Sequence, residues 1–208
     1  MKRVFTQSKW IEILRQGKSI YNFAELIRLS GLSVSSLRRA IHRLIQRGLL
    51  IKLSKGLYAN SFACPSLEEV AGILYPPSYI SLESALFLHG ILDQIPHLVT
   101  CVSLNKTKTF HTTIGEIAYF HIKKDLYFGY QIKDGVPIAL PEKAALDFIY
   151  HQRQNGLEPI LDEWNWDNLN LNKINYLIES YPKTVQKDVA KHISPSLTVA
   201  NNKLLVSE

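Results

Sequence analysis

The chain has few cysteines and no long apolar segment. Its 208 residues include only Cys64 and Cys101, which lie far apart and form no CxxC pair. This excludes a disulfide-rich secreted scaffold, and both thiols are expected to be free and buried. No apolar run reaches the roughly 18 residues that span a bilayer, and the N-terminus lacks the apolar stretch of a signal peptide. We therefore expect a cytoplasmic protein.

The sequence also lacks the short motifs of common enzyme and cofactor sites. It contains no P-loop, no G-x-G-x-x-G and no G-x-S-x-G motif, so nothing in it indicates nucleotide binding or hydrolase chemistry. The seven histidines are scattered and form no H-x-x-x-H pair or Cys/His cluster, which is the spacing that a zinc site needs. We expect no metal ion, no cofactor and no catalytic activity.

Acidic residues are missing from one long segment. No Asp or Glu occurs from Leu26 to Phe62, and residues 1–60 hold twelve Lys and Arg against two acids. The rest of the chain has twelve Lys and Arg against sixteen acids. The positive charge therefore belongs to the N-terminal part. A basic module joined to a mildly acidic one indicates a nucleic acid as the partner.

The basic segment has the pattern of a winged helix-turn-helix domain over residues 1–62. Apolar residues at helical spacing predict helices over 6–16, 22–29 and 33–48. Gly31 suits the left-handed position that ends the second helix, and Ser33 is a good N-cap for the third. The following "LLIKLSKGLYA" predicts a strand, a turn and a second strand, which would form the wing.

The third predicted helix separates an apolar stripe from a basic face. At about 100° per residue, Leu37, Ala40, Ile41, Leu44 and Ile45 lie on one side. Arginines and small hydroxyls on the other side can pair with bases and phosphates. The alternative is an ordinary solvated helix with solubilising lysines nearby, but such a helix normally mixes charge signs. The candidate DNA contacts are Ser33, Ser35, Ser36, Arg38, Arg39, His42, Arg43, Lys52 and Lys55.

Residues 66–193 are predicted to form a second, α+β domain with a small, mainly antiparallel sheet. Residues 60–65 read as a connector, and Ser66 to Glu69 as a capping box before a helix. Stretches rich in Val, Ile, Tyr and Phe predict strands, and proline at a first helical position predicts a helix from Pro141. Residues 194–208 read as a tail. The predicted strands cover 98–104, 115–122, 126–132 and 136–140, and two further helices cover 169–180 and 182–192.

Polar residues in the second domain could suggest a catalytic site, but simpler roles explain most of them. Ser81 is expected to cap a helix, and His89, next to Gly90, to make a contact at the helix end. Lys143 and Asp147 have the i,i+4 spacing of a surface ion pair. No nucleophile, base and orienting group are jointly visible.

Four stretches, in this order, resemble the AbiEi-type antitoxins, which are transcriptional regulators of abortive-infection toxin–antitoxin systems. They are "LSGLSVSSLRRAIHRLIQRGLLIKLSKGLYA", "LYPPSYISLESALFLHGIL", the region around "VTCVS", and "ALPEKAALDFIY". The resemblance spans roughly residues 5–155. The motif residues that carry over in the antitoxin domain are Ser81, Glu83, His89, Glu142, Lys143 and Asp147, and we expect them to be architectural.

The resemblance implies a two-part protein. The winged helix would repress its own operon by binding double-stranded operator DNA with repeated sites. The second domain would counter a nucleotidyltransferase-like toxin without forming a stable complex with it.

Two other interpretations remain open. One is a nucleic-acid-processing enzyme that the winged helix targets. The other is a ligand-sensing transcription factor whose aromatic-rich strands line a pocket, although core packing also explains these side chains.

Overall fold

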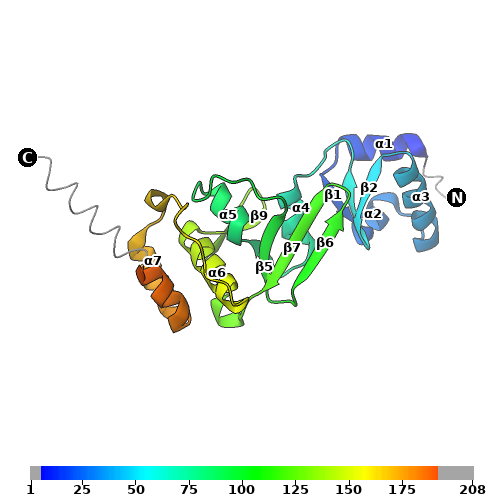
Figure 1. Cartoon of the computed structure of the whole chain (residues 1–208). Coiled ribbons are helices and arrows are strands. Elements are labelled where there is room, and N and C mark those ends of the chain that lie inside the picture. The colour runs from blue at the N-terminus through cyan, green and yellow to red at the C-terminus, as the bar shows by residue number, and fades with distance from the viewer. Residues whose placement is uncertain (1–5, 192–208) are drawn as a thin grey trace, which may run out of the picture.

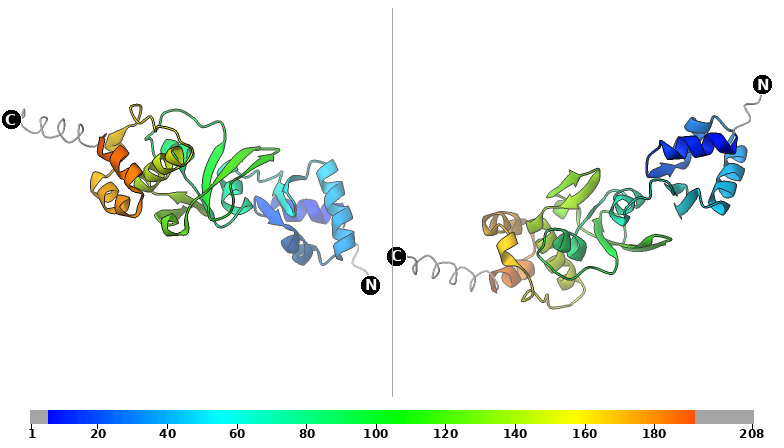
Figure 2. Two further views of the ribbon diagram at one scale, coloured as in Figure 1. Left: turned by 60° about the horizontal axis from the view of Figure 1, so that its bottom comes forward. Right: turned by 90° about the horizontal axis from the view of Figure 1, so that it is seen from above.

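The computed structural model describes residues 6–191, and the protein has an α+β fold. Two parts follow one another along an elongated molecule (Figures 1 and 2). In all views α3 lies toward one end and α7 toward the other. The predicted tail, 194–208, lies outside the described residues.

The N-terminal part combines three helices with a three-stranded antiparallel sheet of order β1-β3-β2. Strand β1 was not predicted, because three residues carry no periodic signal. The elements are α1 (Gln7–Arg15), β1 (Ile20–Asn22), α2 (Phe23–Ser30), α3 (Val34–Gln46), β2 (Leu50–Ser54) and β3 (Leu57–Asn60).

Local side-chain contacts explain where these helices begin and end. Asn22 and Glu25 form a capping box at the start of α2. Gly31 ends α2 with φ 63°, a left-handed conformation that glycine adopts without strain. Ser33 accepts a hydrogen bond from the Ser36 N–H and so caps α3, as predicted. The turn between α2 and α3 is therefore short and well defined.

One apolar cluster holds the three helices together. Trp10 and Leu14 of α1 and Leu26 of α2 are buried against the apolar side of α3. That side consists of Leu37, Ala40, Ile41 and Leu44, as the sequence predicts, with Ile45 partly buried at its edge.

The second part contains a six-stranded sheet flanked by helices. Ser66 and Glu69 form the predicted capping box of its first helix. Residues 183–191 form its last described helix. The elements are α4 (Leu67–Leu74), β4 (Ser78–Ile80), α5 (Leu82–Leu88), β5 (Val99–Ser103), β6 (Lys108–Thr112), β7 (Gly115–His121), η1 (Lys124–Leu126), β8 (Tyr130–Lys133), β9 (Val136–Ala139), α6 (Pro141–Gln154), η2 (Trp166–Asn168), α7 (Leu171–Leu177) and η3 (Ile178–Ser180).

This sheet has six strands, so the prediction of a small sheet was wrong. Three of its five neighbouring strand pairs are antiparallel, which agrees with the prediction of a mainly antiparallel sheet. Its strand order is β6-β7-β5-β4-β9-β8, and two neighbouring pairs, β5 with β7 and β4 with β9, are parallel. Strands β4 and β6 were missed. Strand β4 is only three residues long and pairs with β9, far along the chain, so no local pattern reveals it.

The two parts share a buried apolar face. Ile20, Leu53 and Ala59 of the small sheet belong to the same apolar cluster as Val70 and Tyr119 of the second part. Across this contact the Ser19 hydroxyl donates to the Glu69 carboxylate at 3.3 Å.

The cysteines are free but differ in exposure. Cys101 is buried in β5, as predicted, whereas Cys64 is exposed. The prediction for Cys64 was wrong because this residue lies in the connector between the two parts, where little chain covers it.

Candidate nucleic-acid interface and a buried polar network

Helix α3 turns its basic face to solvent. Arg38, Arg39, His42 and Arg43 are all exposed on the side opposite its buried stripe. Within the described residues, none of these side chains lies within ion-pair distance of a carboxylate. The face therefore keeps its positive charge uncompensated, which favours contact with a polyanion.

The serines at the start of α3 are hydrogen bonded to one another. The Ser33 hydroxyl lies 3.3 Å from that of Ser35 and 3.0 Å from that of Ser36. Arg39 donates to the Ser36 hydroxyl at 3.4 Å. These small side chains leave room for a nucleic-acid backbone at this end of the helix.

The β2–β3 hairpin places two more cations beside α3. Lys52 lies in β2 and Lys55 in the turn, where Gly56 has φ 81°, and both lysines are exposed. Tyr58 on β3 is buried, which raises its pKa, and the nearby charge of Arg38 opposes the shift. Lys52 is the cross-strand partner of Tyr58, and Tyr58 belongs to the same apolar cluster as the buried stripe of α3. The hairpin and α3 are therefore neighbours, and both carry exposed cations.

Arg47 is a further exposed cation near Arg43, although it was not among the predicted contacts. A hollow of about 380 Å³ lies between the start of α1 and the second half of α3, and among the described residues Arg43 and Arg47 are the only charged ones that line it. Arg47 follows Arg43 by four residues, so the i,i+4 spacing could have indicated it.

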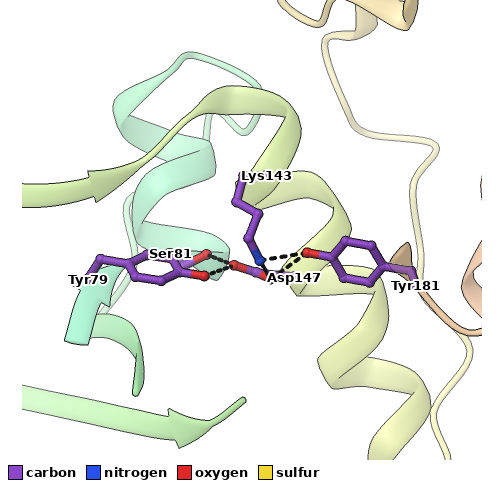
Figure 3. A network of polar contacts seen from close by, with 5 residues as sticks. All are labelled: Tyr79, Ser81, Lys143, Asp147 and Tyr181. Atoms are coloured by element: carbon purple, nitrogen blue, oxygen red, sulfur yellow. Dashed lines mark hydrogen bonds and ion pairs between the residues drawn. The ribbon is translucent and has the colours of Figure 1, made fainter. Parts of the chain in front are cut away.

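A buried polar network lies in the second part, centred on Asp147 of α6 (Figure 3). One carboxylate oxygen accepts from the hydroxyls of Tyr79 at 3.0 Å and Ser81 at 2.9 Å. The other accepts from the Tyr181 hydroxyl at 2.8 Å and from the Lys143 ammonium group. Lys143 also donates to the Tyr181 hydroxyl at 2.6 Å. The network thus ties β4, the start of α5 and the chain near Tyr181 to α6.

The predicted surface ion pair of Lys143 and Asp147 is in fact fully buried. Both side chains are 0% exposed, because α6 is covered on every side over residues 142–150. Burial lowers the pKa of Lys143, and Asp147 opposes this effect. Burial, reinforced by the Asp147 charge, raises the pKa of Tyr79 and of Tyr181, so both hydroxyls stay protonated as donors.

One predicted helix-end contact was wrong and the other was confirmed. Ser81 precedes α5 but makes no side-chain cap, because its hydroxyl is turned toward Asp147. His89 is the C-cap residue of α5, and its backbone N–H donates to the carbonyl oxygen of Ala85 at 3.0 Å. Its ring nitrogen also lies 2.7 Å from the carbonyl oxygen of Ala139 on β9, so the side chain links α5 to the sheet.

Of the six predicted motif residues, only Ser81, Lys143 and Asp147 meet in this network. Glu142 is buried elsewhere, where one carboxylate oxygen accepts from the Asn170 N–H at 3.1 Å. Glu83 lines a separate hollow. Tyr79 and Tyr181 were missed, because no spacing in the sequence relates them to Asp147.

The network has no opening to a substrate, since all five of its residues are buried. Within residues 6–191, no three His, Cys, Asp or Glu side chains are grouped to hold a metal ion. No helix in this range is long and apolar enough to cross a membrane. In comparisons with models of known protein families and with curated proteins, the chain matches none.

Proposed function

We propose that this protein is a DNA-binding transcriptional autorepressor and antitoxin that counters a nucleotidyltransferase-like toxin. The observation that carries the DNA-binding half is the exposed face of α3. Its three arginines and one histidine have no carboxylate partner among the described residues. Double-stranded operator DNA with repeated sites is the partner that this surface suits.

The arrangement of the N-terminal part supports a winged helix-turn-helix. Helices α2 and α3 are joined by a short turn at Gly31, and α3 is followed directly by the β2–β3 hairpin. In this interpretation α3 enters the major groove and the hairpin, with Lys52 and Lys55, contacts the phosphate backbone.

The antitoxin half rests on the resemblance of the sequence motifs. We propose that the second part acts without hydrolytic chemistry of its own. The burial of Ser81, Lys143 and Asp147 supports this, because a nucleophile and its base need access to a substrate. The same burial disfavours a nucleic-acid-processing enzyme.

A binding measurement tests the DNA-binding half. We expect fluorescence anisotropy to show salt-dependent binding of the full chain to duplexes from the upstream region of its own gene. The Arg38→Ala/Arg39→Ala/Arg43→Ala variant should lose most of this affinity, with the log–log salt slope lower by about one unit for each phosphate contact removed.

The matched control removes the same charge from the second part. Lys106, Lys123 and Lys124 are exposed, and replacing all three by Ala should leave DNA affinity almost unchanged. Equal loss in both variants would mean that α3 is not the interface, and absence of binding by the unmodified chain would refute the proposal itself.

A further inference from the structure

A second hollow, of about 370 Å³, lies beside α5, well away from α3 in the sequence and in the fold. This volume is in the range of small-ligand sites. Gln94 and the exposed His97 also line it, and Glu83 and Thr100 supply further polar groups. Its apolar lining residues are Leu92, Ile95, Pro96, Leu98 and Phe120.

Among the described residues, Glu83 is the only acidic one that lines this hollow. The side chain is half-buried, and no Lys, Arg or His of residues 6–191 forms an ion pair with it. Burial raises its pKa, and a hydrogen bond from its own backbone N–H offsets only part of this shift. Carboxylates removed from water are ordinarily paired with a cation. The hollow therefore presents a carboxyl group without an ion-pair partner among the described residues, between walls that are mainly apolar.

The backbone around Glu83 is held firmly in place. The Thr100 hydroxyl donates to the Ser81 carbonyl at 2.8 Å and accepts from the Ser84 N–H at 3.0 Å. The Ser84 hydroxyl accepts from the Thr100 N–H at 2.8 Å. Leu82, directly before Glu83, has φ 56°, an unfavourable value for a residue with a branched side chain. These contacts fix the start of α5, so the carboxylate is presented from a rigid support.

We propose that this hollow binds a ligand that carries an ammonium or guanidinium group on an apolar stem. The cation pairs with Glu83, and the stem contacts the apolar walls. Two sources supply this chemistry: a small organic amine, and a Lys or Arg side chain of a partner protein. The site is independent of the DNA-binding surface and of the antitoxin proposal.

The test is a ¹H–¹⁵N NMR titration of the full chain with three probes of similar length. These are n-butylguanidinium, which is a cation, pentanamide, which is neutral, and pentanoate, which is an anion. We expect n-butylguanidinium to shift the amide signals of Leu98, Thr100 and Phe120 with a dissociation constant in the millimolar range, as is usual for so small a ligand. Pentanamide should bind at least tenfold more weakly, and pentanoate should not bind.

Two variants of equal charge separate the site from general electrostatics. Glu83→Gln should weaken n-butylguanidinium binding at least tenfold, to the level of pentanamide. Asp93→Asn removes the same charge from an exposed residue that does not line the hollow, and it should bind as the unmodified chain does. Ile95→Ala, which changes a side chain that is 71% exposed and so leaves the fold intact, should weaken binding about threefold by shortening an apolar wall.

Three results would overturn the proposal: equal binding of cation and amide, unchanged binding in Glu83→Gln, or no saturable shift with n-butylguanidinium up to about 100 mM, far above a millimolar dissociation constant. A capped peptide, acetyl-Leu-Arg-Leu-amide, distinguishes the two sources. If the peptide binds at least tenfold more tightly than n-butylguanidinium, the natural ligand is a side chain of a partner protein. If the peptide binds equally or more weakly, the natural ligand is a small organic amine.

Discussion

At the scale of single residues, Asp147 organises the second part. Its carboxylate accepts hydrogen bonds from four side chains that belong to three separate stretches of the chain. A buried ion pair adds little stability compared with apolar residues of the same shape, but removal of one partner leaves the other charge buried and unpaired. Packing and this network therefore explain Lys143 and Asp147 of the motif "PEKAALD", whereas the buried Oε2 atom of Glu142 has no hydrogen-bond partner among the described residues.

Asp147→Asn should be strongly destabilising, by about 3–5 kcal/mol, because it leaves the Lys143 ammonium group buried without a counter-charge. A mild effect, as expected for an exposed pair, is excluded by the 0% exposure of both side chains. Chemical denaturation at neutral pH measures the change in the free energy of unfolding.

Glu158→Gln provides the control for this prediction. Glu158 is 76% exposed and its ion-pair distances to Arg153 and Lys191 are 3.7 and 3.9 Å, so its loss should change stability by less than about 0.5 kcal/mol. If both variants unfold at the same denaturant concentration, the network around Asp147 is not the support that its geometry indicates.

At the scale of elements, helix ends were predictable from the sequence and short strands were not. Ser33, Gly31 and the Ser66–Glu69 capping box act through neighbours at most four residues away, so local sequence is sufficient. Strand β4 pairs with β5 and β9, which lie well beyond it in the chain. Strand β6 forms a hairpin with the next strand, β7, but strands of three to five residues give too little periodicity.

The exposed side of α3 carries two rows of polar side chains. Arg39, Arg43 and Arg47 are spaced by four residues, so successive members are rotated by only about 40°. They form a row on the flank that faces α1, where Arg43 and Arg47 line the hollow. Ser35, Arg38 and His42 lie on the other flank. A row beside a second helix suits phosphate contacts, and the outermost side chains suit base contacts.

Arg47→Ala should therefore weaken binding to operator and to unrelated duplexes equally, and it should lower the log–log salt slope by about one unit. Arg38→Ala, in the opposite row, should weaken the free energy of binding to the operator by about 1–3 kcal/mol if Arg38 contacts a base. Binding to the unrelated duplex should not change by this amount. Anisotropy titrations on two duplexes over a range of salt concentrations give both quantities. If Arg47→Ala instead loses the preference for operator over unrelated duplex, and its log–log salt slope is unchanged, Arg47 contacts a base and the assignment of phosphate and base contacts to the two rows is reversed.

At the scale of the whole molecule, the charge asymmetry of the sequence was a good guide to its organisation, but the contact between the parts was not predictable. Residues 60–65 read as a connector, yet Ile20, Leu53 and Ala59 are buried against the second part. The network around Asp147 was equally invisible, because Tyr79 and Tyr181 are brought to α6 only by the complete fold.

This contact bears on whether the two proposed functions can be separated between fragments of the chain. We expect residues 1–62 to bind DNA, because α3 and the β2–β3 hairpin lie wholly within them. We expect residues 66–208 to protect cells from the toxin. Each fragment exposes the shared apolar face, so both should unfold at a lower temperature than the intact chain.

Leu53→Ser in the 1–62 fragment should reduce aggregation without weakening DNA binding, since Leu53 is buried on the face that packs against the second part, away from the proposed DNA-binding surface. Thermal melts, anisotropy and growth during co-expression with the toxin provide the three measurements. If residues 66–208 fold, as judged by circular dichroism, and still give no protection, the second part needs the basic module for its antitoxin role. DNA binding and protection would then be one activity of the joined molecule, transmitted through the contact at Ile20, Leu53 and Ala59.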